Sequence, residues 1–441
     1  MIGSARISRT FYVVWSGQLV SQVGSSLTGF ALAVWVFRET GSATRLALVL
    51  LATTLPGIVL GPLAGALVDR WDRRWAMILS DTGAAAGTLI IAALHFTDSL
   101  QIWHLYPALA LSAAFATFQF PAYSAATSLL VPKEQLGRAA GMVQLAEAVG
   151  QIIGPALGGV LLFWGDLTLV LIVDVATFLF AVLTLAWVRF PAPKTSESGL
   201  EGAGKLWAEA RYGLTYVRQR RPLWALMMFF ATVNFVFGFV GVLMFPLILS
   251  FASEAAAGAA FSIGAFGMLA GSLLVSAWGG PRRRVLGVVS GGFAIGVGLI
   301  IGAVRPSIVL FTIGVLVVMF VLPITNSSSQ AIWQAKVDPD VQGRVFAIRG
   351  TIAQIAIPVS YLLAGPLADG VFEPLMAEGG LLAGTVGEFI GTGDGRGYAL
   401  FFIVLAIASI VAGLIALAYE PLRTLESTMP DAVSDAVPAN L

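Results

Sequence analysis

Apolar residues run through this chain in long blocks that charged residues interrupt only at intervals. A helix needs about 20 predominantly apolar residues to cross the hydrocarbon core of a bilayer, and twelve blocks have roughly that length. We therefore predict twelve membrane-spanning helices. In chain order they cover residues 11–37, 42–68, 76–95, 102–127, 140–163, 167–190, 223–249, 258–279, 285–303, 307–332, 346–368 and 397–418.

The composition supports a membrane protein. Hydrophobic residues make up 58% of the 441 positions and charged residues only 11%, against about 25% charged residues in a typical soluble domain. The first apolar block follows Arg6 and Arg9, has full spanning length and lacks a small-residue cleavage site, so we expect it to stay as a helix. There is no cysteine, which excludes disulfides, zinc–thiolate sites and thiol chemistry.

The distribution of Lys and Arg indicates the orientation in the membrane. With an even number of spans both termini lie on one side. If that side is the cytoplasm, 21 of the 25 basic residues fall in inner segments, and only Arg38, Arg45, Arg305 and Arg396 fall in outer loops. Basic residues concentrate on the cytoplasmic side of membrane proteins. We therefore predict a multi-pass protein of the inner (cell) membrane with both termini cytoplasmic.

The longest inner connection divides the chain into two halves. Residues 191–222 begin with prolines and serines and continue as "KLWAEARYGLTYVRQRRP", in which apolar residues recur at helical spacing. This pattern predicts an amphipathic helix on the inner surface. The expected domains are a six-helix bundle over 1–190, this linker over 191–222, a second six-helix bundle over 223–418 and a cytoplasmic tail over 419–441.

The two halves resemble each other weakly in their inner loops. "VDRWDRR" stands between spans 2 and 3 and "WGGPRRR" between spans 8 and 9, while Gly137-Arg138 and Gly343-Arg344 are 206 residues apart. Corresponding loops on the same side imply a parallel repeat about an axis along the membrane normal, which is common in transporters. The predicted fold class is therefore an all-α polytopic membrane protein with a parallel pseudo-repeat.

Strongly polar residues gather in spans 1, 4, 7 and 10, which are every third helix. Uncompensated polar groups are costly in hydrocarbon, so we predict that these helices line a shared water-filled cavity. The alternative is that the same amides hold neighbouring helices together. The candidate cavity residues are Gln18, Gln22, Gln119, Tyr123, Asn234, Asn326 and Gln330.

The stretch "GPLAGALVDRWDRRW" at residues 61–75 resembles the signature of the major facilitator superfamily between helices 2 and 3. The matching residues are Gly65, Asp69, Arg70, Arg73 and Arg74. Asp72 stands where that family usually has glycine. The resemblance implies a gating role, in which Asp69 faces the positively polarised N-terminus of helix 11, near Arg344 to Arg349, when the cytoplasmic side is closed.

A second match lies in span 5, "GQIIGPALGG". Gly154 and Gly158 are one turn apart and form a smooth face for close helix packing, while Pro155 removes a helix hydrogen bond. The stretch resembles a fifth-helix signature of the superfamily's exporters. Other segments, among them "PKEQLGRAAGMVQ" and "GTGDGRG", are similar to the twelve-helix branch that includes macrolide efflux and enterobactin exporters. The resemblance implies two six-helix bundles that rock around a central site, usually driven by proton antiport.

Three acids lie within predicted spans. Asp81 and Asp174 lie in otherwise apolar helices, which favours packing against a neighbour's Ser, Thr or Arg, with a proton path as the alternative. Glu147 precedes the glycine face of span 5. There it could take up and release protons or contact substrate, or it could be a hydrogen-bonded structural acid.

These features favour a secondary active transporter that exports small amphipathic molecules, drug-like or siderophore-like, by alternating access and proton antiport. One alternative is a symporter or facilitator for uptake on the same scaffold, and another is a membrane scaffold or enzyme. No nucleotide-binding stretch of the type Gly-x-x-x-x-Gly-Lys-Ser/Thr occurs. We expect no enzyme activity, no metal and no cofactor. The expected energy source is the proton gradient. The expected partners are a small-molecule substrate and the bilayer, without nucleic acid, and the expected state is a monomer.

Overall fold

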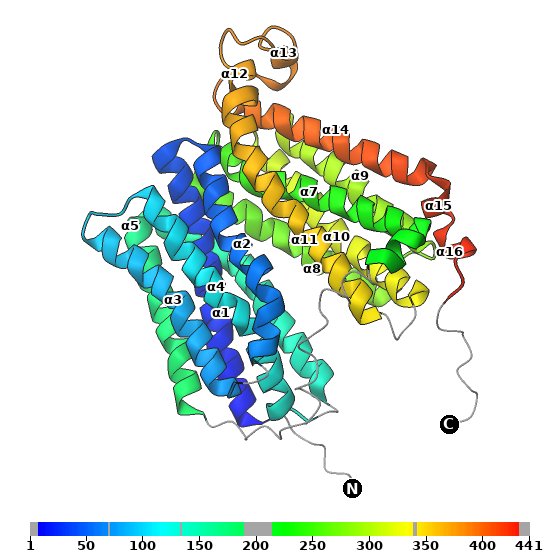
Figure 1. Ribbon diagram of the computed structural model, residues 1–441. Coiled ribbons are helices and arrows are strands. Elements are labelled where there is room, and N and C mark those ends of the chain that lie inside the picture. The colour runs from blue at the N-terminus through cyan, green and yellow to red at the C-terminus, as the bar shows by residue number, and fades with distance from the viewer. Residues whose placement is uncertain (1–7, 69–70, 133–134, 189–213, 338–341, 432–441) are drawn as a thin grey trace. The chain divides into compact units, whose positions relative to one another are not determined.

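The computed structural model describes residues 8–68, 71–132, 135–188, 214–337 and 342–431 (Figure 1). In these ranges the chain is almost wholly helical and contains no β-strand. It separates into two compact units. The first unit comprises Met1–Gly199 with Ala252–Ser262, and the second comprises Leu200–Phe251 with Ile263–Leu441. The predicted linker falls largely outside the described residues, so the predicted domain boundaries stay a prediction.

The first unit consists of five long helices and the first turns of a sixth. They are α1 (Arg9–Thr40), α2 (Ala43–Val68), α3 (Arg73–Phe96), α4 (Ile102–Leu130), α5 (Leu136–Trp187) and the start of α8 (Glu254–Trp278).

The ends of these helices follow from local chemistry. The Ser8 hydroxyl accepts a hydrogen bond from the backbone N–H of Phe11 and caps α1, and Gly41 ends α1 in the left-handed conformation at φ 57°. Asp72 caps α3, because its Oδ1 accepts from the backbone N–H of Trp75 at 3.0 Å. Asp72, which stands where the resembled signature usually has glycine, therefore stabilises the start of α3.

Helix α5 is two helices joined at a kink. Asp166, with φ 54° and ψ −165°, interrupts 52 residues of helix, between the predicted spans 140–163 and 167–190. A Cβ on Gly24 of α1 would meet Thr177, and one on Gly17 would meet Thr184, so the second limb runs antiparallel to α1. Gly150 and Gly158 of the first limb both contact α1, and the later glycine contacts later residues of α1. The first limb therefore runs parallel to α1. The kink therefore folds α5 back on itself.

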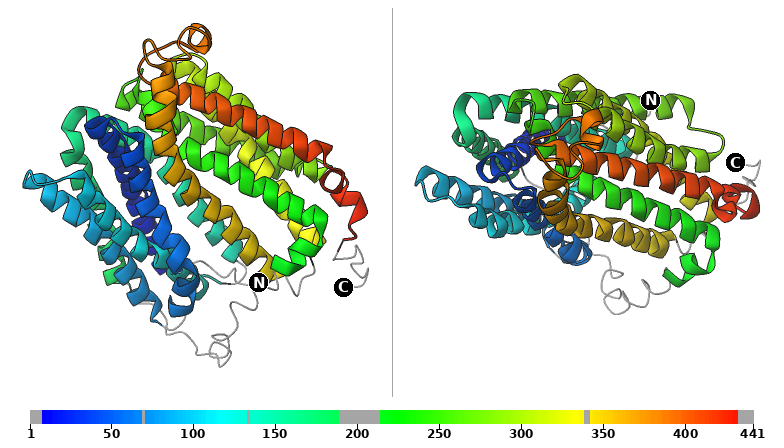
Figure 2. Two further views of the ribbon diagram at one scale, coloured as in Figure 1. Left: turned by 45° about the horizontal axis from the view of Figure 1, so that its top comes forward. Right: turned by 90° about the horizontal axis from the view of Figure 1, so that it is seen from above.

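The second unit contains the remaining long helices, which Figures 1 and 2 show in green to red. Short helices connect α11 to α14 and follow α14. The elements are α7 (Arg221–Leu249), the rest of α8, α9 (Arg284–Ala303), α10 (Ile308–Lys336), α11 (Gln342–Leu367), η3 (Ala368–Phe372), α12 (Glu373–Met376), α13 (Val386–Ile390), α14 (Arg396–Ala418), α15 (Glu420–Arg423) and α16 (Leu425–Thr428).

Close packing of α9 orders the second unit. Its glycines let α10 and α14 approach closely. A Cβ on Gly291 would meet Thr325 of α10, and one on Gly296 would meet Ile410 of α14. The Ser409 hydroxyl donates to Gly292 O at 2.8 Å. Helix α9 is therefore held between α10 and α14.

The helices have the length and surface of membrane spans. Ten helical segments in the described ranges are long and apolar enough to cross a bilayer, and one of them, Leu145–Trp187, contains the α5 kink. The remaining predicted span lies on α4, which has 29 residues. Each of the twelve predicted spans coincides with a helix or with one limb of α5. Large apolar side chains such as Trp187, which is 91% exposed, face outward, as expected where lipid surrounds the protein. The all-α polytopic prediction is confirmed.

Candidate functional site

A cavity of about 530 Å³ lies inside the first unit, between α1, α3, α4 and both limbs of α5. It gathers four predicted cavity residues and all three candidate proton-coupling acids. These are Gln18, Gln22, Gln119, Tyr123, Asp81, Glu147 and Asp174. Residues that are up to 156 positions apart in the sequence thus line one cavity.

A chain of hydrogen bonds crosses this cavity. The Gln119 Nε2 of α4 donates to Gln18 Oε1 of α1 at 2.7 Å, and Gln18 Nε2 donates to Asp81 Oδ2 of α3 at 2.8 Å. Asp81 is only 8% exposed. Because both ends of the Gln18 amide are occupied, its orientation is fixed, and the amide presents a donor to the carboxylate.

Asp174, on the second limb of α5, is 7% exposed and lies beside Thr28 of α1 and Thr88 of α3. Helix α1 can approach this acid because it has glycine there, and a Cβ on Gly24 would lie 2.9 Å from Asp174 Oδ1. The sequence favoured packing of Asp81 and Asp174 against polar neighbours. The structure shows such neighbours and also places both carboxyl groups in the cavity wall.

Charge in the first-unit cavity has one sign. Among the described residues that line it, three are carboxylic acids and none is Lys, Arg or His. Two buried polar atoms there, Tyr123 Oη and Gln119 Oε1, also have no hydrogen-bond partner within the described part of the chain. Buried polar groups are almost always hydrogen-bonded, so these two atoms lack a partner that the described residues do not supply.

A second cavity, of about 510 Å³, lies inside the second unit between α7, α10 and α11. The other three predicted cavity residues, Asn234, Asn326 and Gln330, line it together with Arg349. The sequence had predicted a shared cavity. The structure places four of the seven residues in one unit's cavity and three in the other's.

Two hydrogen bonds and two aromatic rings hold Arg349 in this second cavity. Its guanidinium donates to Gln330 Oε1 at 2.9 Å and to Ser329 Oγ at 3.2 Å. Its Cζ lies 5.6 Å from the centre of the Trp333 ring and 5.8 Å from that of Phe230, within the range of cation–π attraction. Arg349 was predicted to act in gating, and the structure shows a cavity residue whose cation no described lining carboxylate neutralises.

The glycine face of span 5 packs as its pattern predicts. A Cβ on Gly154 would lie 3.0 Å from the backbone N of Leu27, and one on Gly158 would lie 3.0 Å from Leu27 O, so α1 and α5 are in close contact. Pro155 O faces Gly258 in the first turns of α8. The role of this face in transport stays a prediction.

The gating residues of the loop after α2 are described only in part. Asp69 and Arg70 lie outside the described residues. Gly65, Arg73 and Arg344 lie in α2, α3 and α11, but the side chains of the two arginines are also outside the described part. Arg74 is described, and its guanidinium donates to Leu185 O at 2.9 Å and to Ala186 O, which fixes the end of α5 to the start of α3.

Two threonines of the first cavity, Thr28 and Thr88, did not stand out in the sequence. Thr28 continues the face of α1 that carries Gln18, Gln22 and Ser25, so helical periodicity could have identified it. Thr88 lies two turns after Asp81 on α3, and only the packing shows that it meets Asp174.

Comparisons with known proteins agree with this architecture. The model of the Major Facilitator Superfamily matches residues 14–361. Macrolide efflux protein A of Streptococcus pyogenes is 30% identical over 379 residues, which cover 82% of this chain and 90% of that protein. The multidrug efflux pump Tap of Mycolicibacterium fortuitum is 26% identical over 365 residues, covering 80% and 87%.

Among solved structures, a bacterial homologue of the human lysosomal transporter Spinster superposes with a TM-score of 0.66 at 16% identity, covering 95% of this chain and 97% of that one. At such low identity the likeness concerns the fold alone. The family match covers most of the chain and agrees with its helical architecture. The chain belongs to the Major Facilitator Superfamily.

Proposed function

We propose that this protein is a secondary active exporter of small amphipathic molecules, driven by proton antiport. The observation that carries the proposal is the acidic cavity of the first unit, with its unpartnered polar atoms. The names of the relatives, which include macrolide and multidrug efflux proteins, support the direction and the class of substrate.

The lining of the first-unit cavity suits an amphipathic ligand. Apolar side chains such as Leu32, Leu109 and Phe178 stand beside the amides of Gln22 and Gln119. Ligand sites are mostly apolar surfaces with a few polar groups that fix orientation. Such a wall accepts molecules of varied shape, provided that they offer a polar or cationic group to the amides and carboxylates.

The same cavity suits proton coupling. An isolated carboxylate in a low-dielectric environment is costly, and either a bound proton or a bound cation relieves that cost. Asp81 and Asp174 are buried without a basic residue in the described lining. A proton and a cationic substrate would therefore compete for the same groups, which is the requirement for antiport.

The proposal includes the setting of the protein. We place it as a monomer in the cytoplasmic membrane with both termini in the cytoplasm. The concentration of Lys and Arg in the inner segments supports this orientation.

A compound-sensitivity panel tests the proposal. An efflux-deficient bacterial host carrying this chain is compared with the same host carrying an empty vector, over cationic, neutral and anionic amphipathic compounds. We expect resistance to at least one class, and accumulation of that class in inside-out vesicles when the vesicle interior is acidified. Uptake by whole cells, with no accumulation in inside-out vesicles, would establish import and overturn the proposal.

A further inference from the structure

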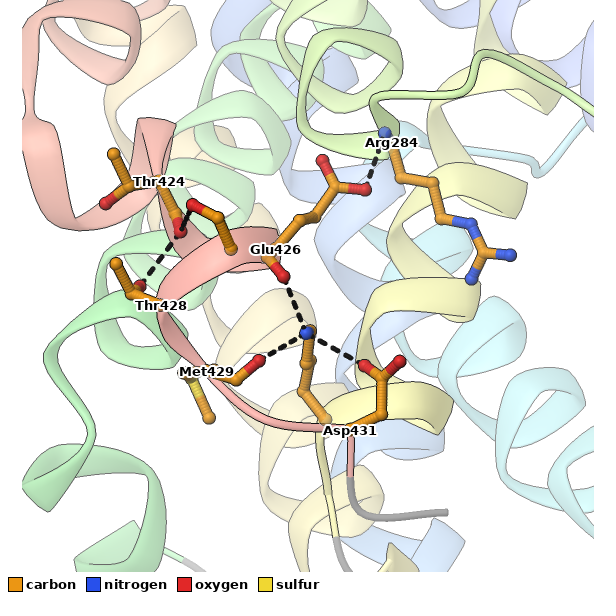
Figure 3. Close-up of polar contacts among 8 residues, drawn as sticks. Arg284, Thr424, Glu426, Thr428, Met429 and Asp431 are labelled. Atoms are coloured by element: carbon orange, nitrogen blue, oxygen red, sulfur yellow. Dashed lines mark hydrogen bonds and ion pairs between the residues drawn. The ribbon is translucent and has the colours of Figure 1, made fainter. Parts of the chain in front are cut away.

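The segment after α14 turns back and docks on the second unit (Figures 1 and 3). Helix α15 packs against α7, and α16 and the residues up to Asp431 lie against the first turn of α9 and the last turn of α10. Leu422 and Leu425 are almost fully buried and anchor the segment. We call the contacts of Lys336, Glu426, Met429 and Asp431 the tail clasp.

Lys336 is the centre of the tail clasp. It is the last residue of α10 and is only 7% exposed. Its Nζ donates to Glu426 O at 2.9 Å and to Met429 O, and forms an ion pair with Asp431 Oδ1 at 2.8 Å. An ammonium group has three donors, and the tail supplies an acceptor for each; Figure 3 labels the three tail residues, Glu426, Met429 and Asp431.

Glu426 extends the clasp to α9. Its Oε1 accepts from the backbone N–H of Arg284 at 3.0 Å and its Oε2 accepts from that of Val285 at 3.2 Å. The N-cap residue Arg283 makes no side-chain cap of its own. The first N–H groups of a helix lack intrahelical partners, and a carboxylate there is favoured by the helix dipole. The tail therefore provides the cap that α9 lacks.

Lys336 lies close along α10 to the residues that hold Arg349. Trp333 is one turn before Lys336, and Gln330 and Ser329 are about two turns before it. All three contact the Arg349 guanidinium through a ring or a hydrogen bond. The last two turns of α10 are thus held at one end by the tail and contact the cavity cation at the other.

We propose that Lys336 is a positioning residue: through the tail clasp it fixes the end of α10, so that Ser329, Gln330 and Trp333 keep Arg349 in place on the wall of the second-unit cavity. Thr325 supports the coupling, because its hydroxyl donates to Gly287 O of α9 at 3.3 Å. The clasp therefore acts on two helices that already contact each other. This proposal concerns the shape of the cavity and does not depend on the direction or energy source of transport.

A cysteine reporter tests the proposal, since the chain has no cysteine of its own. Asn326 is exposed and lines the second-unit cavity, so Asn326→Cys can be labelled with a maleimide in membrane vesicles. Lys336→Met removes the charge and keeps the stem. We expect it to raise the labelling rate by at least about twofold, the lower limit for coupled neighbours. Lys336→Arg should restore the original rate, because a guanidinium can still meet the tail acceptors.

Two comparisons separate positioning from general loss of stability. Glu420→Gln, at an exposed acid on the same tail, should leave labelling unchanged. In an Arg349→Met background the effect of Lys336→Met on labelling should disappear, because the group that it positions is gone. A chain that ends at Thr424 should behave like Lys336→Met.

The proposal is overturned if Lys336→Met only lowers the melting temperature and leaves the labelling rate unchanged, or if its effect persists in full without Arg349. Labelling needs neither substrate nor gradient, so failure of the exporter proposal would leave this result intact, and the reverse also holds.

Discussion

Replacing Asp81 with Asn is expected to weaken transport of cationic compounds selectively. The substitution preserves shape, and the new amide can still pair with Gln18, but the charge and the exchangeable proton are lost. A hydrogen bond to a charged group contributes about 1.5–3 kcal/mol and a neutral one about 0.5–1.5 kcal/mol. For a cationic compound that hydrogen-bonds to residue 81, the difference of about 1–2 kcal/mol between the carboxylate and the amide corresponds to about a 5- to 30-fold loss of apparent affinity.

The structure predicts how this effect depends on the hydrogen-bond network. Gln18 links Asp81 to Gln119, with donor–acceptor distances of 2.8 and 2.7 Å. Gln18→Leu removes that link and leaves a buried carboxyl group without its donor. The two substitutions act on one interaction, so their combined effect should be smaller than the sum of the separate effects.

The assay uses inside-out vesicles and two compounds of similar size, one cationic and one neutral. The apparent affinity for each is measured at several pH values for the parent chain, Asp81→Asn, Gln18→Leu and the double variant. Since Asn has no titratable proton, the part of the pH dependence that Asp81 contributes should vanish. Asp98→Asn is the matched control, because Asp98 is exposed in the turn after α3 at φ 51°, a conformation that Asn tolerates.

Equal losses for the cationic and the neutral compound would refute the reasoning, since they would indicate a damaged cavity and not a lost charge. An unchanged affinity together with an unchanged pH profile would also refute it. In that case the buried acid would be a structural partner of Gln18 only.

Four further substitutions test other parts of the protein. Glu147→Gln should abolish gradient-driven export in vesicles while substrate binding persists, and an unchanged pH dependence would exclude Glu147 from coupling. Asp69→Asn should reduce transport without reducing the amount of protein in the membrane, whereas full activity would exclude the predicted gating role of Asp69. Gly158→Leu places a side chain against Leu27 O and should destabilise the protein by about 1–3 kcal/mol, measured as a lower melting temperature in detergent; an unchanged value would contradict the packing. Arg349→Lys keeps the charge but loses the planar group, so it should impair transport nearly as much as Arg349→Met; full rescue would show that charge alone matters.

The fold could be predicted from the sequence because hydrocarbon imposes a simple rule. A spanning segment must satisfy its backbone internally, which requires a helix of fixed minimum length. The apolar blocks therefore predicted every long helix. The division between the spans 140–163 and 167–190 was predicted, but its form was not. The sequence does not show that an Asp in the left-handed region joins two limbs of α5 with almost no loop.

The cavity residues could be identified in part because polar side chains are rare in apolar helices. Gln18, Gln119 and Asn326 stood out for that reason. The partners of each residue could not be predicted, since they depend on how deeply helices approach one another. Asp174 meets Thr28 only because Gly24 lets α1 come close to α5, and a glycine by itself does not reveal which helix uses it.

The most instructive difference concerns Arg349, which the sequence placed in the predicted gating region, and Lys336, which it counted only among the inner-side basic residues. The charge pattern counts both toward the orientation in the membrane. In the structure Lys336 is enclosed by the tail, and Arg349, which is partly exposed, contacts two rings and two hydrogen-bond acceptors. Holding a cation in this way costs solvation and side-chain entropy, and a residue that only marked orientation would not need it. We therefore infer that the last turns of α10 and the first turns of α11 are built to hold these charges in place, which is the premise that the Lys336 and Arg349 variants test.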